Sequence, residues 1–309
     1  MVDHYRSLEE VQLSQSWLTI GTFDGVHLGH QRIIRSLVDQ AHQHQLPAAV
    51  VTFHPHPTLV LRGGQSSYYL TLPEKRAQLL GEIGVDVVVT HQKKKKTSRL
   101  TAKEFVSRLH RRLHFSQLWI GHDFALGKDR EGNAERLREL GKESGFILKK
   151  IPAFSLDGKL VSSSLIRRLL REGNVSQAAE YLGRPFSLPG EVIPGDSRGK
   201  SLGFPTSNLD VPEDLVALSP GVYACFAEME GKTWQAVTNI GYRPTFGGQE
   251  ERTHIEAHLL DFNQEIYGKE MELFFLERLR PEKKFSQVSE LQGQIRKDIL
   301  RARQIFLEN

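Results

Sequence analysis

Apolar residues in the first half of the chain alternate between short continuous runs and runs with helical spacing. Continuous runs predict buried strands, and apolar residues spaced three and four apart predict helices that cover a sheet. The predicted strands are residues 18–20, 48–53, 85–90, 118–120 and 146–150. The predicted helices are residues 31–44, 74–80, 102–113 and 134–143. This alternation predicts an α/β domain with a parallel sheet between two layers of helices.

The pattern changes after two short predicted helices, residues 163–171 and 175–182. The segment Gly183-Arg-Pro-Phe-Ser-Leu-Pro-Gly190 is rich in residues that interrupt regular structure. Short strands then predominate, with turn signals between them, which predicts a small antiparallel β-barrel with a terminal helix. The predicted elements are strands 190–193, 223–228, 233–239, 253–260 and 271–280 and helix 288–306. We therefore expect two domains, residues 1–184 and 185–309.

Length and composition agree with two globular domains. The 309 residues exceed the usual size of one domain, and 39% hydrophobic with 25% charged residues is ordinary for a globular protein. The sequence has no apolar run long enough to cross a bilayer and no apolar core of a signal peptide at its start. We expect a cytoplasmic protein with no membrane partner.

Charge and cysteine content narrow the chemistry further. A formal net charge of +4 suits small phosphate-bearing ligands and does not require nucleic acid. The basic run Lys93–Lys96 is interpreted as a solvated loop, with RNA binding as the less favoured alternative. Cys225 is the single cysteine, so the chain can form neither an internal disulfide nor a cysteine-based zinc site. The sequence does not indicate whether the protein is a monomer or an oligomer.

The most informative motif is Gly21-Thr-Phe-Asp-Gly-Val-His-Leu-Gly-His30, between the first predicted strand and the first predicted helix. At a strand-to-helix turn, backbone N–H groups and the positive end of the helix form a site for an anion. His27 and His30 flank Gly29, so both imidazoles can face one phosphate with no side chain between them. The alternative is two structural histidines beside a tight turn.

Two further stretches follow predicted strands. Thr52-Phe-His-Pro-His-Pro57 places two histidines at a strand end, where its prolines prevent continuation of the strand. A third metal ligand is not evident, so a positioned loop is favoured there. The glycines of the segment 121–133, together with Lys128 and Arg130, are compatible with a loop around a nucleotide.

The segment Val161-Ser-Ser-Ser-Leu-Ile-Arg167 begins a predicted helix with hydroxyl side chains. Such hydroxyls either cap the free N–H groups of the first turn or hold a phosphate, and capping alone is the simpler interpretation.

The second half contains a false Walker A motif. Gly195-Asp-Ser-Arg-Gly-Lys-Ser201 has three residues between its glycines where that motif has four. The following residues include Gly203 and Pro205, so they cannot open the required helix. Phosphate binding by the glycine-rich turn remains possible, but a P-loop fold is excluded.

The strand Thr253-His-Ile-Glu-Ala-His-Leu259 alternates apolar and polar residues, which places His254, Glu256 and His258 on one face. An ordinary polar face is the favoured interpretation, with a zinc site as the alternative.

From Val11 to Arg303 these motifs resemble the bacterial bifunctional riboflavin kinase/FAD synthetase family. The resemblance implies a Rossmann-like nucleotidyltransferase domain in the first half, in which His27 and His30 bind and stabilise the phosphates of ATP. It implies further nucleotide- or flavin-binding residues at Gly21, Phe23, Asp24, Gly29, His56, Asp123, Ser163, Ser164 and Arg167.

In the second half, Pro205-Thr-Ser-Asn208 resembles the riboflavin kinase signature, with Ser207 in place of alanine. The resemblance implies that Thr206 and Asn208 coordinate Mg²⁺ with ATP and that Glu256 is the general base. It also implies nucleotide or flavin contacts at Gly195, Lys200, Gly203 and Arg243. The family's reactions are phosphorylation of riboflavin to FMN by the C-terminal domain and adenylylation of FMN to FAD, with release of pyrophosphate, by the N-terminal domain.

One stretch departs from the family pattern. Residues 91–99 contain the lysine run where the family has a phenylalanine-bearing segment. Two rival functions remain. The first is a nucleotidyltransferase for another acceptor, such as a pantetheine or glycerol phosphate, which would not need the barrel. The second is a flavin- or nucleotide-sensing protein that binds RNA through Lys93–Lys96, for which salt-dependent RNA binding without turnover would be diagnostic.

Overall fold

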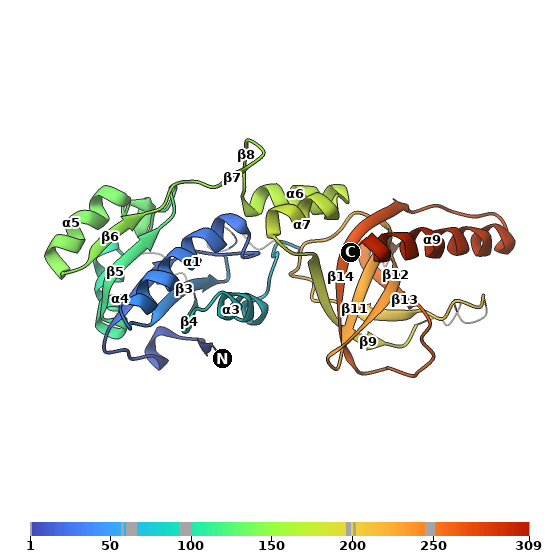
Figure 1. The fold of residues 1–309 in the computed structure, drawn as a ribbon, viewed down its shortest axis with the longest axis horizontal. Helices are drawn as coiled ribbons and strands as arrows, with labels where there is room; N and C mark the ends of the chain where they lie inside the picture. Colours follow the sequence, from blue (N-terminus) through green and yellow to red (C-terminus); the bar gives the residue numbers. More distant parts are fainter. Residues whose placement is uncertain are drawn as a thin grey trace. The chain divides into compact units, whose positions relative to one another are not determined.

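The computed structural model describes residues 2–56, 59, 67–92, 100–195, 199, 202–244 and 251–308, with the backbone alone at residues 242–244 and 251–253. The chain forms two compact units (Figure 1). The first consists of Met1–Gln65 and Tyr69–Ser163, and the second of Ser66–Tyr68 and Ser164–Asn309.

The first unit contains the predicted parallel sheet. Within the described residues its strands pair in the order β1-β4-β3-β2-β5-β6, and every pair is parallel. The strands are β1 (Asp3–Tyr5), β2 (Ser16–Ile20), β3 (Ala48–His54), β4 (Val87–Gln92), β5 (Phe115–Ile120) and β6 (Ile147–Lys150). The five predicted strands are confirmed. The edge strand β1 escaped prediction because it is short and mostly polar.

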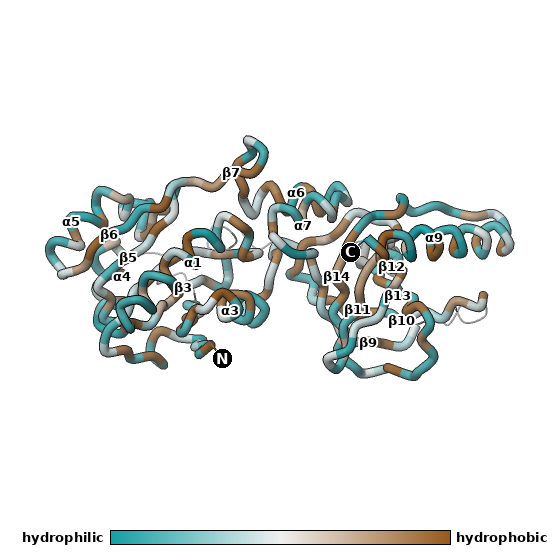
Figure 2. Tube along the Cα trace, in the orientation of Figure 1, coloured by the Kyte–Doolittle hydropathy of each residue, from teal (hydrophilic) through white to brown (hydrophobic). Residues whose placement is uncertain are grey.

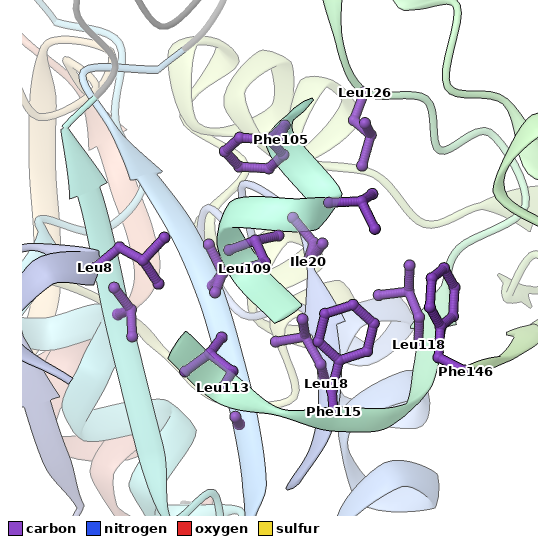
Figure 3. Close-up of a cluster of buried hydrophobic side chains, with 14 of the residues drawn as sticks. Leu8, Leu18, Ile20, Phe105, Leu109, Leu113, Phe115, Leu118, Leu126 and Phe146 are labelled. Atoms are coloured by element: carbon purple, nitrogen blue, oxygen red, sulfur yellow. The ribbon is translucent and has the colours of Figure 1, made fainter. Parts of the chain in front are cut away.

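Helices cover both faces of this sheet. They are α1 (Leu28–Gln43), α3 (Pro73–Glu82), α4 (Ala102–Leu113) and α5 (Ala134–Ser144), with short 3₁₀ turns at Leu8–Glu10 and Lys128–Arg130 and the hairpin β7 (Ser155–Leu156) and β8 (Lys159–Leu160). Alternate residues of the strands face opposite sides, so the sheet divides two cores. Leu18 and Ile20 face α4 and α5 (Figure 3), whereas Trp17 faces α1 and α3. This arrangement confirms the predicted α/β class.

The second unit contains a closed barrel. Within the described residues its strands follow the order β10-β13-β12-β11-β14-β9, with antiparallel neighbours. They are β9 (Phe186–Ile193), β10 (Ser207–Asp210), β11 (Gly221–Met229), β12 (Lys232–Pro244), β13 (Glu251–Leu259) and β14 (Glu270–Pro281). The predicted barrel is confirmed, but β9 begins four residues before the predicted strand 190–193, inside the segment rich in interrupting residues. Pro189 and Gly190 are accommodated by pairing with β14 and β10.

The terminal helix α9 (Val288–Glu308) packs on the outside of the barrel. Ala302, Ile305 and Phe306 contact an apolar patch that includes Val222 and Ala224 of β11. Figure 2 shows hydrophobic and hydrophilic positions interleaved along α9, as expected for a helix with one buried face. The helix is also joined to β14 by the ion pair of Arg280 with Asp298, whose nitrogen and oxygen lie 2.9 Å apart.

Helices α6 (Ser163–Glu172) and α7 (Val175–Leu182) belong, by packing, to the unit that contains the barrel. The helix α7 lies against β14 and β9. The compact units therefore divide at Ser163, about one helical hairpin before the expected boundary near Arg184. That boundary stays a prediction about functional domains, because compactness alone does not assign helices to a reaction.

The part of the chain that the structure describes contains no helix long and apolar enough to span a bilayer.

Candidate active sites

The histidine motif forms the turn from β2 into α1. Phe23, Gly25 and Val26 all have positive φ angles, of +44°, +82° and +42°. This tight backbone path lets α1 begin at Leu28 with His27 as its N-cap. The Nδ1 atom of His27 accepts a hydrogen bond from the backbone N–H of His30, 3.3 Å away. His27 therefore has a structural task in addition to any contact with a ligand.

The two imidazoles of this motif are stacked on each other. Their ring centroids lie 3.6 Å apart at an interplanar angle of 18°. The Phe23 ring meets His30 edge-on, with centroids 5.2 Å apart. A side chain at either glycine would crowd these rings: a Cβ on Gly21 would lie 2.7 Å from the Phe23 ring, and one on Gly29 would lie 3.2 Å from the His27 ring. The motif thus presents a rigid histidine pair at the positive end of α1.

The carboxylate of Asp24 makes contacts inside the protein, and its expected contact with nucleotide or flavin stays a prediction. Its carboxylate is fully buried and accepts hydrogen bonds from the backbone N–H groups of Leu70 and Thr71, each at 3.1 Å. Arg76 completes the environment with an ion pair to Asp24 at 3.4 Å, and both side chains are 0% exposed. In this structure Asp24 holds the histidine turn in place.

Arg76 was missed by the sequence analysis. From α3 it donates hydrogen bonds to the hydroxyl of Thr52 at 3.1 Å and to the carbonyl of Thr71 at 2.8 Å. Arg76 thereby joins the histidine turn to the end of β3, next to His54 and His56. The signal was an arginine on the apolar face of a predicted helix, four residues before Leu80, since a charged side chain at such a position must be paired.

The other predicted residues of the first unit differ in exposure. The backbone N–H of His56 donates to the Tyr69 hydroxyl at 2.7 Å, so this loop is indeed held in position. Asp123 lies in the loop after β5 with 81% of its side chain exposed. Gly121, at the base of that loop, faces α1, since a Cβ there would lie 3.5 Å from the Cδ1 atom of Ile33. The structure thus places this loop beside the helix that carries the histidine pair.

Residues around the start of α6 make contacts of their own. The Ser163 hydroxyl donates to the backbone carbonyl of Asp24 at 2.9 Å, and Ser164 is exposed in the first turn. The Arg167 guanidinium lies 4.0 Å over the Tyr68 ring and donates to the Tyr68 carbonyl at 2.8 Å. Ser163 therefore supports the histidine turn directly. The expected triphosphate contacts of these three residues stay predictions.

In the barrel, three polar side chains lie in one row across neighbouring strands. Asn208 of β10 pairs with Glu256 of β13, and Glu256 pairs with Asn239 of β12. Directly opposed residues of antiparallel strands point to the same face. Asn239 in turn pairs with Val222, which α9 covers on the outside of the barrel, so this row faces outward. The last two residues of the Pro-Thr-Ser-Asn motif therefore belong to a strand, β10, which the apolar periodicity of the sequence did not predict.

Asn208 is well suited to bind a cation. It is 6% exposed, and its Oδ1 atom has no hydrogen-bond partner among the described residues. A Cβ on Gly195 would lie 1.6 Å from its Nδ2 atom, and one on Gly199 would lie 3.0 Å from the Thr206 hydroxyl. Glycines thus make room for both side chains. The buried amide oxygen of Asn208 and the hydroxyl of Thr206 are both oxygen ligands of the kind that Mg²⁺ prefers.

Glu256 itself has a histidine neighbour on the same strand. The Nε2 atom of His254 lies 2.6 Å from Oε1 of Glu256. His258 turns to the motif instead, with its Nδ1 atom 2.7 Å from the Pro205 carbonyl and its ring edge-on to Phe204. Within the described residues no group of three His, Cys, Asp or Glu side chains could hold a metal ion. The polar face of β13 thus consists of separate hydrogen-bonded contacts.

Three predictions lie partly or wholly outside the described residues. Lys200 and the run Lys93–Lys96 are outside them, and the structure describes the backbone of Arg243 but not its side chain. Gly203 is described, with a φ of +85°, in the exposed turn before β10.

These two sites define a class of protein before any comparison is made. A histidine pair at a helix N-terminus beyond a parallel strand is suited to hold phosphates, and the barrel offers cation ligands beside a carboxylate. Two sites of this kind in one chain indicate a two-domain enzyme that transfers phosphorus-containing groups.

Comparison with known proteins assigns the family. A family model for FAD synthetase matches residues 9–165, and one for riboflavin kinase matches residues 182–306. The bifunctional riboflavin kinase/FMN adenylyltransferase of Bacillus subtilis is 35% identical over 301 residues, which cover 96% of this chain and 94% of that protein. The Escherichia coli K12 protein of the same description is 36% identical over 295 residues, with 94% and 92% coverage. The chain belongs to the bifunctional riboflavin kinase/FMN adenylyltransferase family.

A solved structure supports the fold over its full length. A Streptococcus pneumoniae protein described as a macrolide-efflux protein matches with a TM-score of 0.90 and 28% identity, covering 98% of each chain. The shared architecture therefore includes both units.

Proposed function

We propose that the two sites catalyse consecutive ATP-dependent steps of flavin cofactor synthesis. The barrel phosphorylates riboflavin to FMN, and the parallel-sheet domain adenylylates FMN to FAD. The order of the two family models along the chain supports this assignment. The observation that carries it is the row of Asn208, Glu256 and Asn239 on the outside of the barrel, which the adenylylation step alone would not require.

In the kinase step Glu256 acts as the general base. Its carboxylate takes the proton from the riboflavin 5′-hydroxyl, whose oxygen bonds to the γ-phosphorus of ATP as the bond from that phosphorus to the bridging oxygen breaks. ADP leaves. A carboxylate placed beside the attacking hydroxyl is what this transfer needs, because the remaining catalysis is positioning and charge stabilisation.

Thr206 and Asn208 would hold Mg²⁺ with the ATP phosphates. When bound, this ion neutralises charge on the phosphoryl group that is transferred. The buried Oδ1 atom of Asn208 and the room left by Gly195 support this role. The protein's part is to keep the amide oxygen and the hydroxyl in place beside the base.

In the adenylylation step the histidine pair binds the phosphates of ATP. A phosphate oxygen of FMN attacks the α-phosphorus, the bond to the oxygen that bridges to the β-phosphorus breaks, and pyrophosphate leaves. No covalent enzyme intermediate is needed. His27 and His30, with the positive end of α1, supply positive potential where charge develops. The family resemblance assigns Asp123, Ser163, Ser164 and Arg167 to the binding of nucleotide or flavin in the same reaction.

The test is product chromatography after incubation with riboflavin, ATP and Mg²⁺, and separately with FMN. We expect riboflavin to pass through FMN to FAD. Asn208→Ala or Glu256→Ala should abolish FMN formation and leave adenylylation of supplied FMN intact. The double variant His27→Ala/His30→Ala should do the reverse. Loss of both activities in either folded variant would contradict the division of labour.

The rival functions make different predictions in the same assay. A nucleotidyltransferase for another phosphate acceptor would turn over neither flavin. A sensing protein would bind RNA with a steep salt dependence and without turnover. The domain boundary near Arg184 and a cytoplasmic location remain part of the proposal.

A further inference from the structure

The histidine beside the proposed base lies outside the kinase motifs described above. His254 precedes Glu256 by two residues on β13, so both side chains project from the same face of the barrel. The Nε2 atom of His254 lies 2.6 Å from Oε1 of Glu256, and the two side chains are 24% and 28% exposed. This contact is as short as a strong hydrogen bond to a carboxylate.

The chemistry of the contact fixes the direction of the hydrogen bond. An ionised carboxylate only accepts hydrogen bonds, so the proton between the two groups must belong to Nε2 of His254. The histidine therefore donates to the same group that has to receive the substrate proton. One carboxylate oxygen is thereby held in place, which restricts rotation of the Glu256 side chain about its terminal bond.

The neighbouring strand has no side chain opposite this imidazole. The residue opposite His254 on β12 is Gly241, which has no side chain. A Cβ there would lie 2.7 Å from Oε1 of Glu282, so the Glu282 carboxylate occupies the space above that glycine. On the other row, Glu256 lies between Asn208 and Asn239. The imidazole is thus next to the base and one row away from the cation ligand.

We infer that His254 is a positioning residue for the kinase reaction, which orients the Glu256 carboxylate toward the riboflavin 5′-hydroxyl through its Nε2–H donor. This inference rests on the proposed role of Glu256 as the base. His254 does not receive the substrate proton. It restricts the carboxylate to the orientation from which proton transfer can occur, and small errors in such positioning are costly to the rate.

The atom that makes the contact gives a sharp test. Glutamine can place an amide N–H where Nε2 of histidine lies, whereas asparagine is shorter and mimics Nδ1. The experiment measures riboflavin kinase kcat and both KM values for the full chain carrying His254→Ala, His254→Gln or His254→Asn. We expect His254→Ala to lower kcat about 10- to 100-fold with KM for riboflavin and ATP within about twofold, in the range reported for small errors in positioning. His254→Gln should recover most of the loss, and His254→Asn should not.

Unchanged KM values would show that the altered barrel is folded and still binds both substrates. FMN adenylylation in the same chain serves as a second control, since that reaction uses the other domain. A kcat of His254→Ala within twofold of the unaltered enzyme would overturn the inference, as would equal activities of the glutamine and asparagine variants. A rise in KM with an unchanged kcat would overturn it as well, because it would indicate that His254 contributes to substrate binding.

Glu256→Gln separates this inference from the function on which it rests. If Glu256→Gln retains kinase activity, the proposed base is wrong, whatever the histidine variants do. If it abolishes the activity, His254→Ala should cause no further loss of residual turnover in the Glu256→Gln background, because the histidine acts through the carboxylate. An additive further loss would show that His254 acts independently of Glu256.

Discussion

Asn208 and Glu256 lie directly opposite each other on adjacent antiparallel strands, although 47 residues of sequence, from 209 to 255, separate them. One side chain is the proposed cation ligand and the other the proposed base. Strand pairing fixes their separation, because opposed residues share a face at nearly constant spacing. The barrel therefore supplies the geometry of the kinase site through its backbone register.

The space left by Gly195 should be essential for the kinase. A Cβ at this position would lie 1.6 Å from the Nδ2 atom of Asn208 and would displace that side chain. We expect Gly195→Ala to lower riboflavin kinase kcat at least about 100-fold, the cost of a misplacement of about 1 Å. Adenylylation of FMN should be unchanged. Gly293→Ala is the matched control, because nothing lies within 4 Å of its built Cβ. Full kinase activity in Gly195→Ala would show that Asn208 is not needed where it lies.

The histidine pair has two tasks that one substitution can separate. His27 caps α1 through Nδ1, and asparagine is also a good N-cap residue. We expect the free energy of unfolding of His27→Asn to lie within about 0.5 kcal/mol of that of the unaltered protein. The variant should nevertheless adenylylate FMN at least about 10-fold more slowly, because the imidazole is lost. Denaturant unfolding and FAD formation from supplied FMN measure the two effects. Normal FAD formation in this variant would restrict His27 to a capping role.

The buried pair of Asp24 and Arg76 should make a large contribution to stability. Arg76→Met leaves the Asp24 carboxylate buried without its cation, which we expect to cost about 3–5 kcal/mol of unfolding free energy. Arg76→Lys should cost less, since it keeps the charge and loses the forked hydrogen bonds. Two of the three tryptophans, Trp17 and Trp119, lie in this domain, so tryptophan fluorescence during urea unfolding reports mainly on it. A loss below about 1 kcal/mol in Arg76→Met would contradict this assignment.

Cys225 should be unreactive in the native protein. Its thiol is completely buried in the barrel, and burial raises its pKa to about 12. The reactive thiolate is therefore scarce at pH 8, and reagents cannot reach it. We expect iodoacetamide at pH 8 to label the protein only after denaturation, as measured by intact mass. Rapid labelling of the folded chain would show that the barrel opens. Cys225→Ser should retain both activities, since the thiol contacts no site residue named above.

Local sequence patterns were sufficient for the elements that bury a regular face. The helices α4 and α7 begin and end where the apolar spacing predicts. The strands β3 and β4 differ from prediction by at most two residues at either end. Such elements are recognisable because their buried positions follow a regular pattern. In a helix every third or fourth residue is buried, and in a central strand a continuous run is buried. The same reasoning placed the histidine pair at the start of α1.

Elements that depend on pairing with distant residues were less visible. The strand β10 has four residues, of which two are polar, and it exists because β13 and β9 hydrogen-bond to it. The strand β9 contains Pro189 and Gly190, which locally argue against a strand. In both cases tertiary hydrogen bonds outweigh local preference.

The sequence by itself determined the two-domain organisation, the fold classes and, through its motifs, the family and the reactions. These depend on residue identity and short-range spacing, which can be read along the chain. The tertiary structure alone decided that Asp24 is paired with Arg76 inside the protein, that Ser163 supports the histidine turn and that His254 lies against Glu256. Each of these contacts depends on the direction of a side chain and on which atoms are buried, and both are set by packing across the whole domain.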